Sequence, residues 1–341
     1  MTLLAATPEE LARLATDNGF PAFRGRQLFG WIHKRAVLDP SAMTNLPIAF
    51  RELVASRGPI VPARAGRTLR SEDGTRKIEI VLEDGARVET VLIPEGPRLT
   101  QCISTQVGCA VGCAFCRSGR AGFKRNLTPA EIVAQVHVAR AQREPGESLR
   151  NVVFMGVGEP LHNLAGTLRA LEILGHPDGL DLSSRRVTVS TVGVPRGIAR
   201  LGEATRGEAA LAVSLHAADD ATRAELVPGA SASLSEIVEA IAAYPLPKRR
   251  RCTIEYVLIQ GVNDSDADAR SLVRLLSNVR IKINLLPLNE HDLTKYQPPS
   301  EERVASFQQV LLDKGVSAFV RRRRGADIEA ACGQLLALES P

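Results

Sequence analysis

The sequence predicts an α/β fold whose parallel sheet curls into a partial (β/α) barrel. From residue 99 onward, apolar segments typical of strands alternate with segments typical of helices. The strand segments begin near Thr100, Asn151, Arg186, Ala210, Arg251, Ile281 and Ala318. Such alternation indicates parallel strands joined by right-handed helical crossovers. Six or seven of these units within about 240 residues fit a full or incomplete barrel.

Helix start signals lie between these strand segments. Thr128 opens a Thr-Pro-Ala-Glu sequence, which combines a capping box with proline at the first helical position. Ser300, followed by Glu301 and Glu302, begins another helix in the same manner. Both signals support helices as the connections between barrel strands.

Two further segments precede the barrel, and they give predicted domains at 1–60, 61–95 and 96–341. The first is expected to be helical, because Thr7 can cap a helix that begins with Pro8. Within it, the basic and apolar segment 26–35 is either a packed helix with a solvated basic edge or part of an RNA-contacting module. The second segment is a β-hairpin extension, because alternating residues flank the turn signal Asp84-Gly85.

The composition is that of a globular protein with a small basic excess. Hydrophobic residues make up 44% of the chain, and the formal net charge is +5. A basic chain favours an acidic partner such as nucleic acid. The sequence has no run of 18 apolar residues and no secretory pattern in its first ten residues. We therefore expect a cytoplasmic protein with no membrane partner.

Three closely spaced cysteines form the most informative motif. Cys109, Cys113 and Cys116 have the spacing C-x3-C-x2-C and follow the first barrel strand. Three thiolates in one loop can hold a [4Fe-4S] cluster and leave one iron open. That iron can bind S-adenosylmethionine (SAM), whose reductive cleavage yields a 5′-deoxyadenosyl radical. The alternatives are buried free thiols or a zinc site, and the lack of a nearby fourth ligand argues against zinc.

Polar residues at later strand ends are candidates for binding SAM, because barrel enzymes place their sites at the C-terminal ends of the strands. Gly158 and Glu159 follow the second strand, and Glu159 is a candidate partner for the SAM ammonium group. The other candidates at strand ends are Ser190, Ser214, His216 and Asn289. Capping of a turn explains the two serines equally well.

Two outlying thiols and two basic runs have more than one explanation. Cys102 lies in the first barrel strand, and Cys332 lies in the last predicted helix. A free thiol is usually a buried structural residue, but the Cys102 strand ends at the expected site. The runs 248–251 and 321–324, with Lys124 and Arg125, form either solvated faces or a phosphate-contacting surface.

With these residues, the chain resembles the RlmN/Cfr family of radical SAM adenosine methyltransferases. The resemblance covers nearly the whole length, and its most specific feature is the pairing of Cys102 with the sequence Ala-Ala-Cys332-Gly-Gln. The other matching segments are 23–32, 87–90, 102–109, 122–127, 154–160, 214–216, 254–256, 261–264 and 324–334.

The resemblance implies a partial radical SAM barrel with a small helical N-terminal domain that contacts RNA. It implies that one SAM methylates Cys332, and that a radical from a second SAM removes hydrogen from this methyl group. The resulting carbon radical adds to an adenine ring carbon. Cys102 then resolves the protein–RNA adduct through a transient disulfide with Cys332, and Glu89 accepts a proton. The implied SAM-binding residues are Gly158, Glu159, Ser190, Ser214, Leu215, His216 and Asn289.

Within the family, Pro160 and Arg324-Gly325 are similar to the type that methylates adenine C2 in 23S rRNA and tRNA. An electron donor such as flavodoxin or ferredoxin is then a further partner. The alternatives are C8 methylation, as in the Cfr type, and a non-catalytic iron–sulfur RNA-binding protein. Cys102, Cys332 and Glu89 argue against the last, because simple binding needs none of them. Segments 117–120 and 288–291 depart from the family pattern, which leaves the RNA substrate open.

Overall fold

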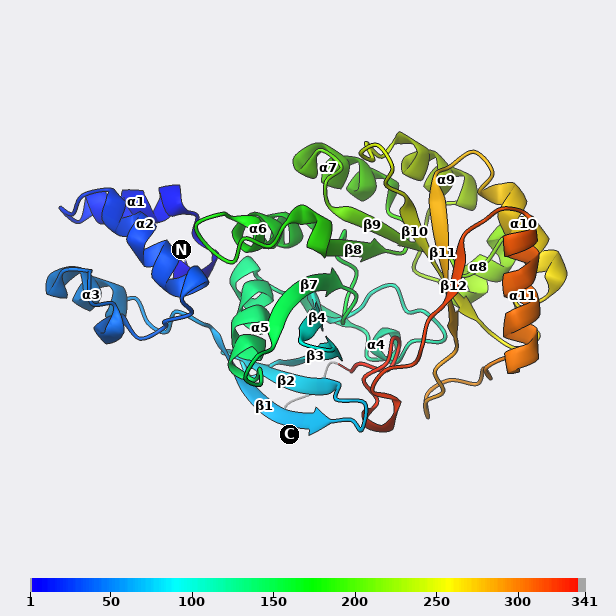
Figure 1. Ribbon diagram of the computed structural model, residues 1–341, viewed down its shortest axis with the longest axis horizontal. Helices are drawn as coiled ribbons and strands as arrows, with labels where there is room; N and C mark the ends of the chain where they lie inside the picture. Colours follow the sequence, from blue (N-terminus) through cyan, green and yellow to red (C-terminus); the bar gives the residue numbers. More distant parts are fainter. Residues whose placement is uncertain (1, 337–341) are drawn as a thin grey trace.

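The computed structural model describes residues 2–336 and confirms the predicted partial barrel (Figure 1). One ten-stranded sheet has the order β1-β2-β3-β4-β7-β8-β9-β10-β11-β12. Its strands pair antiparallel from β1 to β4 and parallel from β4 to β12. Since β1 and β12 stand at opposite ends of this order, the barrel of the described residues is open. Residue 1 and residues 337–341, at the outer ends of the predicted domains, lie outside the described residues.

The strands alternate with helices after β4, as expected. The strands are β1 (Ala63–Arg70), β2 (Arg76–Leu82), β3 (Arg87–Glu95), β4 (Arg98–Cys102), β5 (Gln106–Gly108), β6 (Phe123–Asn126), β7 (Ser148–Phe154), β8 (Val187–Thr191), β9 (Ala210–Ser214), β10 (Cys252–Leu258), β11 (Ile281–Pro287) and β12 (Ala318–Val320). The α-helices are α1 (Pro8–Asp17), α2 (Phe23–Phe29), α3 (Ile48–Ala55), α4 (Arg117–Arg120), α5 (Pro129–Ala141), α6 (Leu164–Gly175), α7 (Pro195–Thr205), α8 (Asp220–Leu226), α9 (Leu234–Ala243), α10 (Asp266–Leu275) and α11 (Glu301–Asp313). Short 3-10 turns are η1 (Leu3–Ala5), η3 (Pro40–Ala42), η4 (Ser184–Arg186) and η5 (Ala326–Ile328), and η2 (Gly30–Lys34) is a π-helical turn.

The predicted helix starts are correct. Thr128 and Glu131 form a reciprocal capping box at α5, in which the Thr128 amide donates to Glu131 Oε2 at 2.7 Å. Ser300 caps α11 by accepting from the Arg303 amide. Each cap satisfies amides that would otherwise lack partners at the start of a helix.

The β-hairpin extension continues the barrel sheet. The turn at Asp84-Gly85 joins β2 to β3 as predicted, and Gly85 has the positive φ of 84° that this turn requires. The sequence did not predict β1, which adds a third antiparallel strand, nor the separate β5–β6 pair. The register of β3 against β4 places Val91 opposite Cys102, so the extension lies directly beside the first barrel strand.

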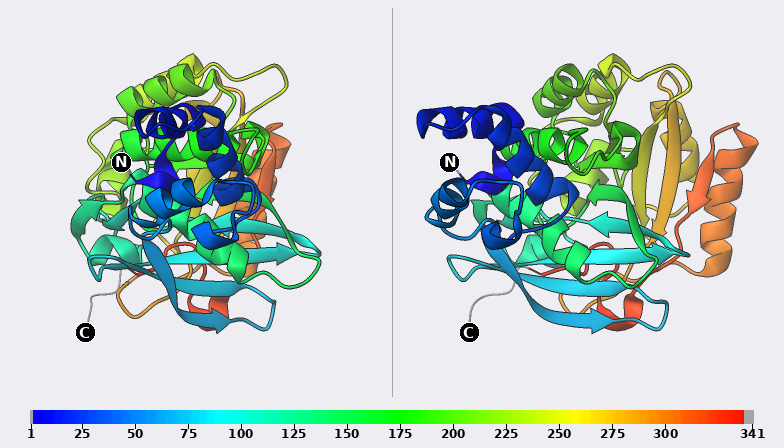
Figure 2. Two further views of the ribbon diagram at one scale, coloured as in Figure 1. Left: turned by 90° about the vertical axis from the view of Figure 1, so that its left-hand side faces the viewer. Right: turned by 60° about the vertical axis from the view of Figure 1, so that its left-hand side comes forward.

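The N-terminal helices pack against the outer helices of the barrel (Figure 2). Glu10 on α1 pairs with Arg169 on α6 at 2.9 Å. His33 contacts His137 on α5 at 3.2 Å. In the segment 26–35, Trp31 is buried, which agrees with a packed helix. We propose, as predicted from the sequence, that the chain is divided into domains at 1–60, 61–95 and 96–341.

Alternation along the strands directs side chains either to the helices or to the barrel interior. On β10, Ile254 and Tyr256 are fully buried, whereas Glu255 and Val257 line the interior pocket. No helix of residues 2–336 is long and apolar enough to cross a membrane.

The predicted helix around Cys332 is absent from this part of the described chain. Only the turn η5 forms, and Cys332 follows it in an irregular segment. Positive φ values at Gly325, Glu329 and Gly333 interrupt any continuous helix there.

Candidate active site at the strand ends

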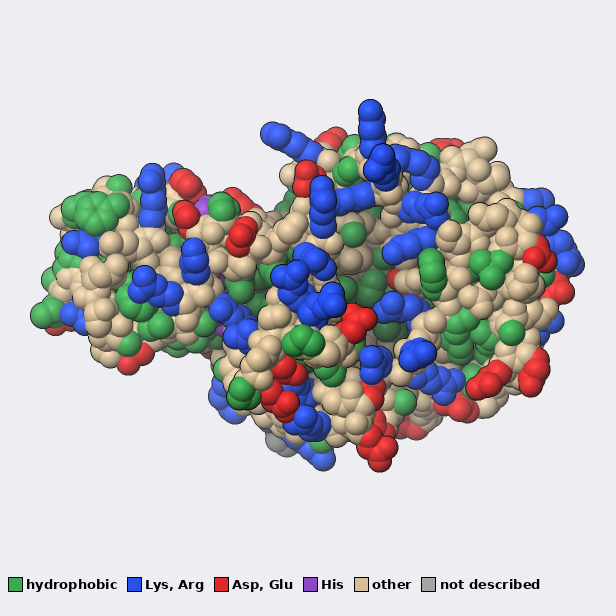
Figure 3. All heavy atoms as spheres, in the orientation of Figure 1, with side chains coloured by type: hydrophobic (Ala, Val, Ile, Leu, Met, Phe, Trp, Pro, Cys, Tyr) green, Lys and Arg blue, Asp and Glu red, His purple; other side chains and the backbone are tan. Residues whose placement is uncertain are grey.

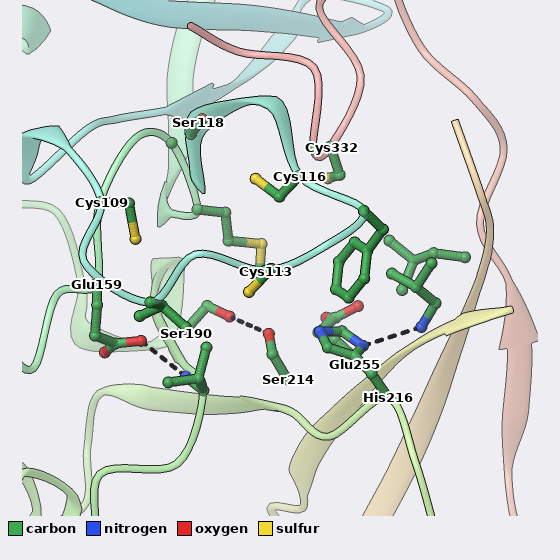
Figure 4. Close-up of a pocket in the computed structure, with 18 of the residues that line it drawn as sticks. Cys109, Cys113, Cys116, Ser118, Glu159, Ser190, Ser214, His216, Glu255 and Cys332 are labelled. Atoms are coloured by element: carbon green, nitrogen blue, oxygen red, sulfur yellow. Dashed lines mark hydrogen bonds between the residues drawn. The ribbon is translucent and has the colours of Figure 1, made fainter. Parts of the chain in front are cut away.

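The C-terminal ends of the parallel strands surround one pocket of about 970 Å³, including its open mouth (Figure 4). This is the place where barrel enzymes assemble their sites. The pocket residues on successive strands and the turns after them include Met155, Gly156, Gly158 and Glu159 (after β7), Ser190, Thr191 and Val192 (end of β8), Ser214 and His216 (end of β9), Glu255 and Val257 (within β10), and Leu288 and Asn289 (after β11). The cysteine loop and the Cys332 segment complete the wall.

Cys109, Cys113 and Cys116 all line this pocket, and Figure 4 shows the three thiols around the same part of it. Backbone hydrogen bonds fix the loop that carries them. The Cys109 amide donates to the Gly122 carbonyl at 3.0 Å, and the Cys116 amide donates to the Cys113 carbonyl at 3.0 Å. The sequence motif therefore folds into one thiol-lined corner.

The donor arrangement fits a multi-iron cluster better than a zinc ion. Within residues 2–336, no three His, Cys, Asp or Glu side chains converge closely enough to hold a single metal ion. A cubane cluster instead needs three thiolates spread around its corners, with space for the remaining iron and its ligand. The shared pocket beside the three thiols offers this space.

Burial disfavours the thiolate form of Cys109 and Cys113. Burial raises the pKa of Cys109 to about 11, and burial together with neighbouring thiols raises the pKa of Cys113 as well. Positive metal centres reverse this preference, because they stabilise a coordinating thiolate directly. The corner is thus suited to a group that carries positive charge.

Replacing Gly108 by Ala is expected to remove most of the cluster. Gly108 has a φ of 74°, and an added Cβ would lie 1.7 Å from the Gly122 carbonyl oxygen. The loop must therefore shift at the residue before Cys109. Iron content after anaerobic reconstitution measures this. Gly96→Ala is the control, because Gly96 also has a positive φ but nothing within 4 Å of the added Cβ. Equal iron in both variants would contradict the role of Gly108.

Glu159 is buried in the pocket wall and ties two strand ends together. Its Oε1 accepts from the Leu161 amide at 2.9 Å and its Oε2 accepts from the Val192 amide at 2.8 Å. Burial raises the pKa of Glu159 to about 7, although these amides oppose the shift. Gly158 precedes it with a φ of 103° and packs on Gln106, so the turn has no room for a side chain.

Three further SAM-binding candidates, Ser190, Ser214 and His216, line the pocket, whereas Leu215 does not. Ser190 Oγ and Ser214 Oγ are 3.5 Å apart in the pocket. His216 Nδ1 accepts from the Val257 amide at 3.1 Å, and burial lowers its pKa to about 3, so the ring is neutral. Leu215 is fully buried and does not line the pocket.

Asn289 connects the pocket to the segment that carries Cys332. Its Nδ2 donates to the Cys332 carbonyl at 3.0 Å. Cys332 lines the pocket, and its surroundings raise the pKa of its thiol to about 11 mainly by burial, with Glu255 adding to the shift. The residue as a whole is exposed, so the segment forms part of the pocket mouth.

Cys102 and Glu89 do not line the pocket. Cys102 is buried on β4, where burial and nearby Cys332 raise its pKa. All six cysteines are free thiols, so the expected disulfide between Cys102 and Cys332 is not formed in this structure. Glu89 on β3 lies under the C-terminal segment, and its Oε2 accepts from the Leu336 amide at 2.9 Å.

Two charged residues at the site were not predicted from the sequence. Glu255 lines the pocket near Cys332 and accepts from Asn284 Nδ2 at 2.9 Å. Arg223 is buried, donates to the Leu215 carbonyl at 2.6 Å, and interacts electrostatically with Cys113. A carboxylate inside the apolar segment 252–258 was a usable signal for Glu255, because an interior polar residue in a barrel strand needs a partner.

The basic residues divide into distinct locations. Arg321–Arg323 are exposed and follow β12 at the pocket end of the sheet, where Arg321 interacts electrostatically with Glu255. Residues 248–251 precede β10 and therefore lie at the opposite strand ends. Arg125 is held by Glu131 and Asp84, which leaves it poorly placed for phosphate. Figure 3 shows a hollow with an apolar floor and a rim rich in Lys and Arg.

A partial barrel with three thiols of a C-x3-C-x2-C loop at its strand ends defines a radical SAM enzyme. The chain matches the model of the Radical SAM superfamily over residues 103–273. It also matches the model "Ribosomal RNA large subunit methyltransferase N-terminal domain" over residues 1–59.

Full-length relatives narrow the family. The chain is 50% identical to "Dual-specificity RNA methyltransferase RlmN" of Sorangium cellulosum, over 98% of this chain and 95% of that protein. It is 46% identical to the protein of the same name from Solidesulfovibrio magneticus, over 98% and 96%. A radical SAM methyltransferase from Sphaerobacter thermophilus superposes with a TM-score of 0.94 at 44% identity, covering 99% of this chain and all of that chain. The chain belongs to the RlmN family, as the sequence resemblance indicated, and is a methyltransferase that uses a [4Fe-4S] cluster and SAM.

Proposed function

We propose that this protein methylates C2 of an adenine in 23S rRNA and in tRNA. The relatives named dual-specificity RNA methyltransferases support RNA as the substrate. The observation that carries the proposal is the position of Cys332, which lines the pocket while Cys102 lies buried nearby. A methyl carrier and a resolving thiol have no use in a protein that only binds RNA.

Cys109, Cys113 and Cys116 are the proposed ligands of the cluster, which when bound supplies the electron that cleaves SAM. The serine pair and the neutral His216 offer polar contacts to SAM without adding charge. Glu159 fixes the turn beside them through the Val192 amide. The full set of proposed SAM contacts is Gly158, Glu159, Ser190, Ser214, Leu215, His216 and Asn289, of which Leu215 contributes only its backbone because its side chain packs in the core.

Three residues of the chain carry the proposed transfer to RNA. The Cys332 thiol takes the methyl group by displacement and holds it at the pocket mouth. Glu89 accepts the proton that the adenine carbon loses. Cys102 then attacks the Cys332 sulfur, which forms a disulfide and breaks the carbon–sulfur bond. The electron pair of that bond goes to the methylene carbon, which takes up a proton and becomes the methyl group, and the disulfide is later reduced. Displacement from SAM alone does not suffice, because the adenine carbon is a poor nucleophile.

Nucleoside analysis separates this function from its alternatives. The reconstituted protein is incubated anaerobically with SAM, a reductant and either 23S rRNA or tRNA, and the digested RNA is analysed by mass spectrometry. We expect 2-methyladenosine in both RNAs. Formation of 8-methyladenosine would favour the Cfr-type alternative, and RNA binding without any methylation would favour the non-catalytic one. Flavodoxin and ferredoxin are the proposed physiological reductants, and comparison of the two in this assay tests them.

Arg321, Arg322 and Arg323 are expected to contact phosphates of the RNA. Changing all three to Ala should weaken binding. It should also reduce the slope of log K against log salt by about 2, because fewer counterions are released on binding when fewer phosphates are contacted. The control changes Lys248 and Arg249, which are exposed at the opposite strand ends, and should leave the slope unchanged. Equal slopes for wild type and the 321–323 variant would show that these arginines form a solvated surface and do not contact phosphates.

A further inference from the structure

The segment that carries Cys332 depends on side-chain contacts for its position. Between residues 325 and 336 it contains only the turn η5 and pairs with no strand of the described sheet. A segment with so few internal backbone hydrogen bonds is held in place by the elements around it. The residues that hold it therefore decide where the methyl carrier stands.

The β1–β2 hairpin supplies part of that support. Ser71 Oγ donates to Asp327 Oδ1 at 2.5 Å. Farther along β2, Lys77 Nζ donates to the Glu329 carbonyl oxygen at 3.1 Å. Figure 1 shows this C-terminal segment lying along the end of the hairpin. The extension contacts the carrier segment through these bonds and through others, such as the one from the Gly325 amide to Asp73 Oδ2 at 3.2 Å.

Strand register places Lys77 on the face that bears the proposed resolving thiol. Lys77 lies opposite Val91, and Val91 lies opposite Cys102, so the three residues form one row across β2, β3 and β4. Glu89 is two residues from Val91 on the same strand and therefore shares this face. Two residues of the proposed adduct chemistry, Glu89 and Cys102, are thus neighbours of Lys77.

Lys77 bridges Glu89 and the carrier segment. Its Nζ lies 3.2 Å from Glu89 Oε1, while it also donates to Glu329. Both side chains of the pair are buried, with exposed side-chain fractions of 9% for Lys77 and 7% for Glu89. A buried ammonium group paired in this way is strongly coupled to its carboxylate, because water screens it little.

The groups around Glu89 act in opposite directions on its charge. Burial raises the pKa of Glu89, while the Leu336 amide, Lys77 on β2 and Arg117 on α4 lower it. Glu79, opposite Glu89 on β2, is itself paired with Arg87 at 3.0 Å. Among residues 2–336, Lys77 is the cation in direct contact with the Glu89 carboxylate.

We infer that Lys77 is a positioning residue, whose ammonium group pairs with Glu89 and holds its carboxylate against the carrier segment for proton abstraction from the RNA adduct. The radical adduct must first lose its unpaired electron, for which the oxidised cluster would be the acceptor. The C–H bond of the adenine ring carbon then breaks, its electron pair stays on the ring and restores aromaticity, and the proton joins a Glu89 oxygen. This inference rests on the proposed function. It adds a role for the hairpin extension, which then serves the chemistry as well as the fold.

The test compares wild type with Lys77→Met, Lys77→Arg and Ser71→Ala in the full-length, anaerobically reconstituted protein. Cluster content and methylation of Cys332 without RNA are measured first, by iron analysis and intact-protein mass spectrometry. The rate of adenine methylation in a single turnover is then measured from pH 5.5 to 9. Ser71→Ala weakens the hairpin contact with the carrier segment but leaves the Glu89 pair intact, so it controls for general loosening.

Loss of Lys77 should act on the second half of the reaction. In Lys77→Met we expect cluster content near wild type, with adenine methylation, counted per methylated Cys332, slowed about tenfold or more at pH 7. Without the cation the pKa of Glu89 rises, so the acid limb of the pH profile should move up by about one unit or more. Lys77→Arg should restore the limb, and Ser71→Ala should not move it.

Either of two results would overturn the inference. These are an unshifted acid limb in Lys77→Met, or a limb that moves equally in Ser71→Ala. If Lys77→Met fails to fold, Lys77→Gln carries the same test, because an amide keeps a donor for Glu329 without the charge. Absence of methylated adenine in wild type would instead remove the proposed function, which keeps the two failures distinct.

Discussion

Replacing any one of Cys109, Cys113 or Cys116 by Ala is expected to abolish both the cluster and the cleavage of SAM. Wild-type protein prepared without oxygen should contain about four irons and four sulfides per chain, as a cubane held by three thiolates requires. With one thiolate missing, a second iron loses its protein ligand and the cluster is no longer retained. We expect iron near background and 5′-deoxyadenosine at least a hundredfold below wild type.

Cys252→Ala is the matched control for these variants. Cys252 is also a buried free thiol, but it begins β10 at the strand end away from the pocket. Its loss should leave iron, sulfide and SAM cleavage within about twofold of wild type. Stoichiometric zinc without iron after anaerobic reconstitution would contradict the cluster assignment for all three ligands.

Local sequence signals predicted the barrel well, because its elements are specified by short-range chemistry. Thr128 and Ser300 mark the starts of helices, because each caps its helix by bonding to a residue only three positions away. Apolar segments such as 252–258 form strands that are buried on the helix-facing side. Neither signal depends on knowing which strands become neighbours.

The elements that sequence missed are those that tertiary contacts create. Half of the residues of strand β1 are polar, and its exposed positions do not alternate regularly with its partly buried ones. Its pairing with β2 therefore defines it as a strand. The segment around Cys332 has a helix-like composition, yet Glu329 adopts a φ of 52° there. Contacts with Lys77 and Asn289 hold that irregular backbone in place.

The residues of the candidate site also fall into two groups, those that sequence spacing predicts and those whose role depends on tertiary contacts. The three cysteines of the cluster loop are close in sequence, so their joint role was predictable from spacing alone. Glu255 and Lys77 are isolated charged residues in strands, and their relation to Cys332 depends on sheet register and on the course of the C-terminal segment. A slip of one residue would turn Lys77 to the other face of the sheet.

Replacing Cys332 and Cys102 separately by Ala should give opposite results for the covalent protein–RNA adduct. This difference distinguishes the proposed mechanism from direct methyl transfer. Cys332→Ala removes the proposed carrier, so we expect no methylated adenine and no covalent protein–RNA species, although SAM cleavage can continue uncoupled. Cys102→Ala leaves the carrier in place but removes the thiol that releases the product. The methylene bridge between Cys332 and adenine then has no route to cleavage, and the adduct should accumulate to nearly one per active enzyme.

Anaerobic denaturing gels with end-labelled RNA measure both outcomes at once. The adduct of Cys102→Ala should migrate as a labelled band at the combined mass of protein and RNA, and it should be absent from wild type, from Cys332→Ala and from the double variant. The buried position of Cys102 beside Val91 and near Cys332 is the reason to expect that no other thiol replaces it. Full turnover by Cys332→Ala would refute the carrier role, and failure of Cys102→Ala to trap any adduct would remove its role in release.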